Sequence, residues 1–278
     1  MNITILGSGG WEGIPAPFCK CRVCKSAKNS KSKDYRTRPE ILIESAKGKI
    51  LLEISPDIRL QSSRFDLSGV KDFFISHWHF DHMYGLLELH AWSDIIMNGK
   101  INIYCSKNTK DWLDKSFGYI PKNIIVLKPF QKITLFGMNI TPIPLQHMYS
   151  QDIELSESQL ENVYGYLIEE KGKKFVYLAD YFNIPNKSLD IIKGSNIVVM
   201  DGTFLFEELF PNKHEQNVLK KDPDHCHGKN ILLLAKKINS KKTIFHSITD
   251  LTEKKHDELQ KMLPKQLYLS YDGMKLKL

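Results

Sequence analysis

The chain has 278 residues, of which 42% are hydrophobic and 26% charged, a composition typical of a globular protein with a core of normal size. No run of about 18 apolar residues occurs, which excludes a membrane-spanning helix, and we expect no membrane partner. Much of the formal net charge of +7 lies in residues 19–38. This permits a nucleic-acid partner without favouring one, because Tyr35 is the one aromatic side chain there that could stack on a base.

The first half of the chain predicts mainly β-strands. Residues 1–10, MNITILGSGG, alternate like a strand and do not resemble a signal peptide, so we expect a cytoplasmic protein. The segment GLLELHAW (85–92) has helical spacing. Short apolar runs bounded by turn residues predict a hairpin of 40–45 with 49–54, and further strands at 72–76, 101–105, 123–127, 132–136 and 138–145.

The second half mixes strands and helices. Strands are predicted at 163–169 and 173–180 as a hairpin around Gly172, and at 196–201 and 242–247, with helices at 227–238 and 251–263. Such a mixture of hairpins and strand-to-helix crossovers predicts an α+β or α/β layered sandwich. No break in composition divides the chain, so we expect a single domain over 1–278. Residues 148–162 and 203–224 lack periodicity, which is typical of functional or mobile loops.

The stretch SHWHFDH (76–82) places three histidines and an aspartate directly after a predicted strand. Residues two apart in an extended segment point the same way, so His77 and His79 can bind one ion together. Asp81 and His82 come where the chain turns into the next helix, and they can bind a second ion. One histidine alone would be interpreted as a core residue, but this spacing favours a metal site. Imidazole and carboxylate ligands suit zinc, manganese or iron(II).

Three further residues follow apolar runs elsewhere in the chain. His147 comes after 138–145, Asp180 ends 173–180 and His246 lies in 242–247. A two-metal site needs ligands from several strand ends, including a bridging carboxylate. Each residue alone could be an ordinary boundary residue, but together with SHWHFDH they predict a dinuclear centre.

This order of HxHxDH, His, Asp and His resembles the metallo-β-lactamase superfamily. Within it, the chain resembles the phosphoribosyl 1,2-cyclic phosphodiesterases of the carbon–phosphorus lyase pathway. The motifs GSGGWEGIPAPFCKCRVC, SHWHFDHMYGL, TPIPLQHM, YLADYFNIP, VVMDGT, DHCHGKN and YDGM have counterparts there in the same order. The segment SPDIRLQ instead resembles pyrroloquinoline-quinone biosynthesis protein B, a relative whose HxHxDH motif is degraded. The motif is intact here, which favours a catalytic protein.

The resemblance implies a four-layer αββα sandwich with the site at one edge of its two sheets. It implies two divalent ions, zinc or manganese, and a metal-bridging hydroxide that attacks phosphorus. The first ion is expected on His77, His79 and His147, the second on Asp81, His82 and His246, with Asp180 bridging them.

Residues near the substrate are also implied by the resemblance. His225 is expected to protonate the leaving group or stabilise the phosphate, and Asp81 is counted with it as catalytic. His227 is a weaker candidate, since a pair of solvated loop histidines explains both residues as well. Asp201 is expected either to orient a ligand histidine or to act in a turn.

The three cysteines at Cys19, Cys21 and Cys24 resemble a zinc-knuckle loop. They lie too close together for an ordinary disulfide framework, and three thiolates favour one structural zinc ion. A closed tetrahedral site needs a fourth ligand. Where the resembled phosphodiesterases have a histidine, this chain has Thr249, which leaves Asp250 and His256 as the candidates.

The leading hypothesis is a metal-dependent phosphoric diester hydrolase that acts on a small cyclic or diester phosphate. One alternative is a nuclease of the transfer-RNA 3′-processing type, although no long inserted arm is evident in the sequence. Another is a non-hydrolytic cofactor-biosynthesis protein like pyrroloquinoline-quinone biosynthesis protein B. Hydrolysis of lactones or β-lactams ranks below these, because fold alone does not exclude it. Assembly as a homodimer is left open.

Overall fold

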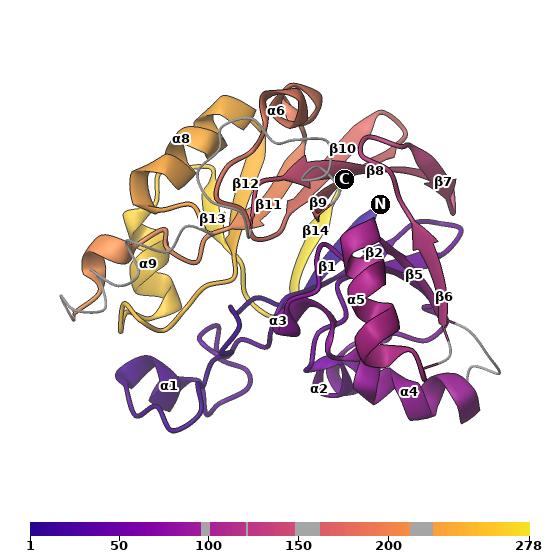
Figure 1. Cartoon of the computed structure of the whole chain (residues 1–278). Coiled ribbons are helices and arrows are strands. Elements are labelled where there is room, and N and C mark those ends of the chain that lie inside the picture. Colours follow the sequence, from indigo (N-terminus) through magenta and orange to yellow (C-terminus); the bar gives the residue numbers. More distant parts are fainter. Residues whose placement is uncertain (96–100, 121, 148–161, 212–224) are drawn as a thin grey trace.

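The computed structural model describes residues 1–95, 101–120, 122–147, 162–211 and 225–278. In these residues two seven-stranded sheets stack face to face (Figure 1). The first sheet consists of β1 (Asn2–Gly7), β2 (Glu40–Glu44), β3 (Lys49–Leu52), β4 (Asp72–Phe74), β5 (Ile101–Cys105), β6 (Lys122–Val126) and β14 (Met274–Lys277). Its order is β14-β1-β2-β3-β4-β5-β6, with β3 to β6 parallel and the rest antiparallel.

The second sheet repeats this plan. It consists of β7 (Ile133–Leu135), β8 (Met138–Leu145), β9 (Val163–Glu170), β10 (Lys173–Leu178), β11 (Ile197–Asp201), β12 (Lys242–His246) and β13 (Leu267–Leu269). The order is β13-β12-β11-β10-β9-β8-β7, and β10 to β13 are parallel. Because β8 and β10 are both antiparallel to β9, they run in the same direction as each other.

Helices cover the outer faces of both sheets (Figure 1). Against the first sheet lie α2 (Ile58–Arg64), α4 (Leu86–Ile95) and α5 (Lys107–Phe117). Against the second lie α6 (Asn186–Ile192), α8 (Gly228–Ile238) and α9 (His256–Met262). The short α3 (Phe80–Met83) and the 3₁₀ turn η2 (Glu207–Leu209) lie in loops.

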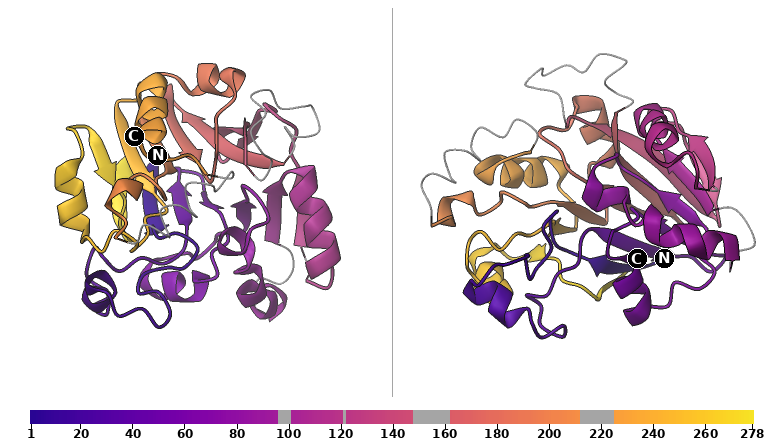
Figure 2. Two further views of the ribbon diagram at one scale, coloured as in Figure 1. Left: turned by 60° about the vertical axis from the view of Figure 1, so that its left-hand side comes forward. Right: turned by 60° about the horizontal axis from the view of Figure 1, so that its bottom comes forward.

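Another helix, α1 (Arg22–Ser26), lies in the cysteine-containing loop. It is next to α9, and the two lie side by side in Figure 2. Arg22 Nη1 contacts Glu258 Oε1 of α9 at 3.1 Å. The N-terminal loop is thereby held against the segment that follows β12.

Alternation along the strands produces the layers. In β10, Phe175 and Tyr177 join the cluster between the two sheets, whereas Val176 and Leu178 join the cluster under the outer helices. Successive strand residues point to opposite faces, so a strand buried on both sides reads as a continuous apolar run. Both faces of each sheet are therefore covered, one by the other sheet and one by helices.

The predicted α+β, four-layer αββα sandwich is confirmed by this arrangement, and so are the hairpins β2–β3 and β9–β10. The two segments expected to form functional or mobile loops, 148–162 and 203–224, lie largely outside the described residues. No helix in the described part of the chain is long and apolar enough to cross a membrane.

The helix predicted for 251–263 is wrong at its start. The structure begins α9 at His256, because Glu253 has a positive φ of 52° that does not fit a right-handed helix. The helix then begins with a hydrogen bond from the Lys255 backbone N–H to Glu258 Oε2 at 2.7 Å. The residues before it form a turn, which leaves Asp250 free of the helix.

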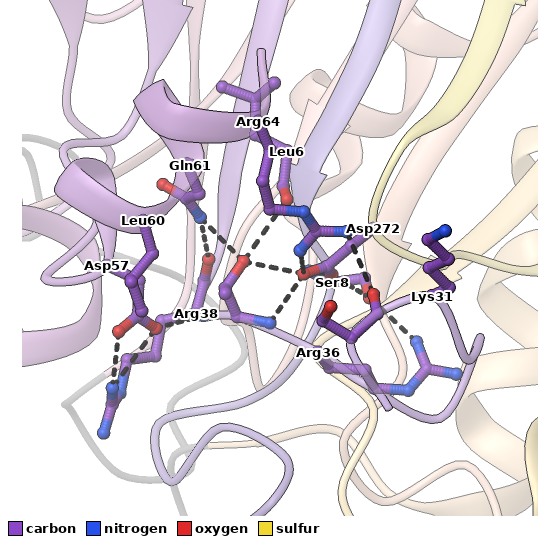
Figure 3. Close-up of polar contacts among 12 residues, drawn as sticks. Leu6, Ser8, Lys31, Arg36, Arg38, Asp57, Leu60, Gln61, Arg64 and Asp272 are labelled. Atoms are coloured by element: carbon purple, nitrogen blue, oxygen red, sulfur yellow. Dashed lines mark hydrogen bonds and ion pairs between the residues drawn. The ribbon is translucent and has the colours of Figure 1, made fainter. Parts of the chain in front are cut away.

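The turn between β13 and β14 anchors the end of β1. The Asp272 carboxylate accepts hydrogen bonds from the backbone N–H and hydroxyl of Ser8, at 2.9 and 2.8 Å. It also accepts two from Thr37, both at 2.8 Å, and Figure 3 shows Asp272 beside Ser8. These bonds fix the start of the GSGG segment, whose Gly10 reaches the pocket described below.

A close backbone approach positions α3. The Gly85 N–H donates to Ile54 O at 3.0 Å, and a Cβ at Gly85 would lie 2.0 Å from Ser55 O. We expect Gly85→Ala to lower the free energy of unfolding by roughly 1–3 kcal/mol, the cost of overpacking, as measured by urea denaturation.

Gly172→Asn is the matched control for this variant. Gly172 has a positive φ of 73° in open space, and asparagine tolerates that conformation. A change of less than about 0.5 kcal/mol is expected there. Equal stability of Gly85→Ala and the original protein would contradict the close approach at Gly85.

Candidate metal centre

Strand ends bring polar side chains to one edge of the molecule. β8, β10, β11 and β12 run in one direction, so their carboxyl ends meet at the same edge of the second sheet. His147 and Asp180 follow β8 and β10, and Asp201 and His246 end β11 and β12 as paired neighbours. The segment 75–83, from the first sheet, completes the cluster.

The first ligand group contains His77, His79, His147 and Asp180. One potential ligand atom from each of these side chains lies within 4.8 Å of the others. His147 Nε2 is 3.4 Å from His79 Nδ1, and His77 Nε2 is 3.9 Å from Asp180 Oδ2. The three histidines that the sequence assigns to one ion therefore lie together.

The second ligand group contains Asp81, His82 and Asp180. His82 Nε2 lies 3.3 Å from Asp81 Oδ2 and 3.4 Å from Asp180 Oδ2. Asp180 belongs to both groups, which is the position that a bridging carboxylate requires.

His246 departs from the expected arrangement. The structure does not place it in the group around Asp81, His82 and Asp180, although its side chain is only 2% exposed. Its Nδ1 lies 3.3 Å from Ser270 Oγ, and its Nε2 has no hydrogen-bond partner among the described residues. Burial, Arg36 and His82 lower the pKa of His246 to about 3, so the ring is neutral. It is near the second group without joining it.

Burial keeps two of the clustered histidines neutral. It lowers the pKa of His77 well below the ordinary value, helped by the neighbouring His82 and His79. Burial likewise lowers the pKa of His79, against the opposing charge of Asp180. Neutral imidazole is the form that binds a metal ion.

His82 and Asp180 form the charged part of the cluster. Burial opposes a charge on His82, but Asp81, Asp180 and Glu53 outweigh it and raise the pKa of His82 well above its ordinary value. Burial also opposes ionisation of Asp180, yet His82 and His225 hold the pKa of Asp180 well below its ordinary value. A divalent ion would replace the proton on His82 as the partner of these carboxylates.

The donor set fits divalent metal ions. His77 Nε2 is buried and has no hydrogen-bond partner among the described residues, like His246 Nε2. Unsatisfied buried polar atoms are rare in folded proteins, and a bound ion would account for them. Imidazoles with a shared carboxylate suit zinc or manganese.

Ser76 and Glu53 contact the ring nitrogens of His77 and His82 that face away from the cluster. Ser76 Oγ lies 2.9 Å from His77 Nδ1, which leaves Nε2 to face the cluster. Glu53 Oε1 lies 3.2 Å from His82 Nδ1, while Glu53 Oε2 accepts the Ser76 N–H at 3.1 Å. Such partners fix the orientation and tautomer of ligand histidines. Sequence reasoning missed Glu53, although a carboxylate at the end of the apolar run 49–54 was a detectable signal.

His225 and Asp201 form a pair next to Asp180. His225 Nδ1 lies 2.9 Å from Asp201 Oδ2, and His225 Nε2 lies 3.8 Å from Asp180 Oδ2. Thr203 fixes Asp201 by donating its N–H and hydroxyl to Oδ1, at 2.9 and 2.7 Å. Asp201 thus orients His225, whereas His227 lies 2.8 Å from Glu207 and does not line the pocket.

A pocket opens over this cluster. It is lined by His79, Asp81, Asp180 and His225, and also by Trp11, Glu12 and Phe80 among others. Burial raises the pKa of Glu12 to about 7. From the sequence, WEGIPAPF (11–18) is expected to form either a pocket wall or a packed loop, and its Trp11 and Glu12 do line the pocket. Nothing in the sequence singles out Glu12 itself.

The cysteine loop has Asp250 as its fourth candidate ligand. Cys19, Cys21, Cys24 and Asp250 each offer a ligand atom within 4.8 Å of the others. Asp250 Oδ2 lies 2.8 Å from Cys24 Sγ and 3.5 Å from Cys21 Sγ. Burial and the Asp250 carboxylate raise the pKa of the Cys24 thiol, which a bound ion would reverse.

The other candidate, His256, lies elsewhere. Its Nδ1 is 3.0 Å from Arg36 Nη2, and its backbone N–H donates to Asp34 Oδ1 at 2.7 Å. The Arg36 guanidinium contacts Nδ1, and His256 does not belong to the ligand group around the cysteines, so the structure does not support it as a ligand of that site.

The position of His256 predicts a loss of stability in acid. Burial, Arg36 and Lys33 lower the pKa of His256 to about 4, below the ordinary 6.5 that applies in the unfolded chain. Between pH 6.5 and pH 4, His256 binds a proton in the unfolded chain but not in the folded protein. The contribution of neutral His256 to the free energy of unfolding is therefore fully present above pH 6.5 and is lost as the pH falls toward 4. His256→Asn keeps an acceptor without a titrating ring. Between pH 7.5 and pH 5 we expect the variant to lose about 2 kcal/mol less unfolding free energy than the original. Identical losses would contradict this.

The cysteine site predicts a third metal ion. Asp250→Ala is expected to lower the zinc content by one ion per chain, measured by native mass spectrometry, whereas Asp250→His should retain it. Asp257→Ala is the matched control, because that side chain is exposed on α9. Equal zinc content in Asp250→Ala and Asp257→Ala would exclude Asp250 as a ligand.

Curated proteins with similar sequences match most or all of this chain. Among curated proteins, the octanoyltransferase of Porphyromonas gingivalis is 24% identical over 276 residues, which are 99% of this chain and 51% of that protein. The chain thus spans about half the length of that relative. The coenzyme PQQ synthesis protein B of Methylobacterium radiotolerans is 25% identical over 228 residues, 75% of each chain.

Solved structures share the whole fold. A diphosphatase from the PhnP family has a TM-score of 0.80 and 27% identity, covering 100% of this chain and 97% of that one. Zn²⁺-bound PqqB from Methylobacterium extorquens has a TM-score of 0.79 and 20% identity, covering 100% of both. The short form of human tRNase Z has a TM-score of 0.67 and 15% identity, covering 100% of this chain and 99% of that one.

A family model described as the beta-lactamase superfamily domain matches residues 49–248, which contain SHWHFDH, His147, Asp180 and His246. This match covers well over half of the chain. With the two-sheet sandwich and the ligand groups at its edge, it confirms the resemblance stated from the sequence. The chain belongs to the metallo-β-lactamase superfamily.

Proposed function

We propose that the protein is a dinuclear metal-dependent phosphodiesterase that acts on a small cyclic or diester phosphate. The observation that carries this proposal is the sharing of one buried carboxylate, Asp180, by two ligand groups beneath a pocket. Two divalent ions bound there would lower the pKa of water and neutralise charge on phosphoryl oxygens. Zinc and manganese both suit the ligands.

The chain's own residues prepare the site for that chemistry. Ser76 and Glu53 orient His77 and His82. Asp180 stays ionised next to His82 and His225, so it can serve both ligand groups at once. These contacts hold the ligands in place before substrate arrives, and such preorganisation is a large part of electrostatic catalysis.

His225 is positioned to move a proton. The hydrogen bond with Asp201 is completed by a proton on Nδ1, which leaves Nε2 directed to Asp180 and the pocket. A proton on Nε2 could pass to the oxygen that leaves phosphorus, and Asp201 would stabilise the charged ring before that transfer. We therefore assign leaving-group protonation to His225, supported by its place in the pocket wall.

Hydrolysis of a phosphoanhydride is the second candidate. The observation that favours it is the 27% identity, over the whole chain, to a protein described as a diphosphatase. The same site chemistry would serve, since hydrolysis of an anhydride also breaks a P–O bond by attack at phosphorus. A third possibility, suggested by SPDIRLQ, is a non-hydrolytic role in cofactor biosynthesis. The intact HxHxDH motif argues against that role.

The test is a substrate panel with a matched pair of variants. Protein loaded with zinc or manganese is expected to hydrolyse bis(p-nitrophenyl) phosphate and 2′,3′-cyclic nucleotides, to lose activity with EDTA and to regain it with metal. Asp180→Asn should lower kcat by roughly 100-fold or more, because it removes a charge on which both ligand groups depend. Asp190→Asn, on the exposed surface of α6, should change nothing.

The panel also separates the alternatives. A nucleoside diphosphate cleaved faster than every diester would favour the phosphoanhydride hydrolase, and cleavage of precursor transfer RNA alone would favour the nuclease. Full activity of Asp180→Asn, or equal loss in Asp190→Asn, would reject the dinuclear mechanism.

A further inference from the structure

The pocket is larger than a phosphodiester group requires. Its cavity volume is about 960 Å³, near the upper end of the roughly 300–1,000 Å³ found for small-molecule sites. The candidate ligands and His225 occupy one part of the wall. The rest of the cavity is left for a substituent of the phosphate.

Aromatic side chains line much of the remaining wall. They are Trp11, Trp78, Phe80, Tyr84 and Phe204. Trp11 is 72% exposed and Phe80 is 43% exposed, so two large rings at this pocket face solvent. Exposed aromatic surface at a concave site is typical of a ligand-binding face.

Arg38 holds this wall in place. Its Nε donates to Trp11 O at 3.0 Å, and its guanidinium lies 5.5 Å from the centre of the Phe80 ring. Its charge is paired with Asp57, whose two carboxylate oxygens lie 3.0 and 3.2 Å from Arg38 Nη1 (Figure 3). Arg38 is not among the residues that line the pocket. It therefore anchors the Trp11 backbone, lies over the Phe80 ring and pairs its charge with Asp57.

The same wall does not suit a second anionic group. Among the lining residues that the structure describes, none is lysine or arginine. Glu12 adds a carboxylate, and its Oε2 is buried with no hydrogen-bond partner in the described chain. A second phosphate here would face the carboxyl groups of Glu12 and Asp250 without a lysine or arginine among the described lining residues, whereas an N–H group would find an acceptor on Glu12.

We infer that the substrate carries a flat, uncharged aromatic group of the nucleobase type, which stacks on Trp11 and Phe80, and carries no second phosphate. An N–H of that group would donate to Glu12. This inference rests on the proposed phosphodiesterase function and deepens it, because it names the arm attached to the phosphodiester. Stacking on aromatic side chains is how proteins hold bases without reading their sequence.

Three compounds with the same reacting ring test the inference. They are adenosine 2′,3′-cyclic phosphate, methyl β-ribofuranoside 2,3-cyclic phosphate, which lacks the base, and adenosine 2′,3′-cyclic phosphate 5′-phosphate, which adds a phosphate. Each is measured on metal-loaded protein as a substrate and as a competitive inhibitor of bis(p-nitrophenyl) phosphate hydrolysis. The first compound is expected to bind on the order of tenfold more tightly than the second, the effect of stacking one base. The third should bind more weakly than the first.

Variants on one loop provide the matched control. Trp11→Ala should remove most of the advantage of the adenosine compound over the methyl riboside and leave the methyl riboside unchanged. Phe18→Ala should leave both unchanged, because Phe18 is an aromatic residue of the same segment that is 100% exposed and does not line the pocket. Glu12→Gln should narrow the gap between the first and third compounds.

The outcomes separate the inference from the proposed function. Hydrolysis of bis(p-nitrophenyl) phosphate with equal binding of the first two compounds, or with preference for the third, would overturn the aromatic arm and leave the phosphodiesterase standing. No hydrolysis of any diester would overturn the phosphodiesterase. In that case, calorimetry with adenosine 5′-phosphate and ribose 5-phosphate tests base stacking on the aromatic wall independently of hydrolysis. Equal affinities for the two compounds would reject stacking.

Discussion

The Asp180 carboxylate is the group on which the candidate centre depends. It is buried, yet it lies 3.4 to 3.9 Å from ring nitrogens of His77 and His82, in the SHWHFDH stretch, and of His225, in a distant segment of the chain. A buried carboxylate is stable only when neighbouring positive groups or donors offset its desolvation. The two sheets must therefore meet at a fixed edge, because a shift of either sheet would leave this charge without partners.

Much of this could be predicted from the sequence, for local reasons. The apolar runs of β10, β11 and β12 end in polar residues, and parallel strands bring such ends to one edge. The HxHxDH spacing is also local, since alternation and the turn into α3 direct its side chains. Fold and most ligand positions follow from these two patterns and from the family resemblance.

Other parts depend on contacts between distant segments. Asp250 and His256 are equally plausible by position in the chain, and the choice is made by Arg36, whose guanidinium contacts the His256 ring. His246 ends its strand as expected, but strand register alone does not set how far its ring reaches toward His82. The helix expected from residue 251 was wrong because Glu253 adopts a left-handed backbone.

Asp250 belongs both to the cysteine site and to the wall of the pocket. Its carboxylate contacts the thiols of Cys21 and Cys24, while Asp250 and its neighbours Thr249 and Leu251 line the pocket. The segment also continues directly from β12, which carries His246. An ion on the cysteines and a ligand in the pocket would therefore be thermodynamically linked. Oxidation of the exposed Cys19 would remove one candidate ligand from the cysteine site, and with it one end of this link.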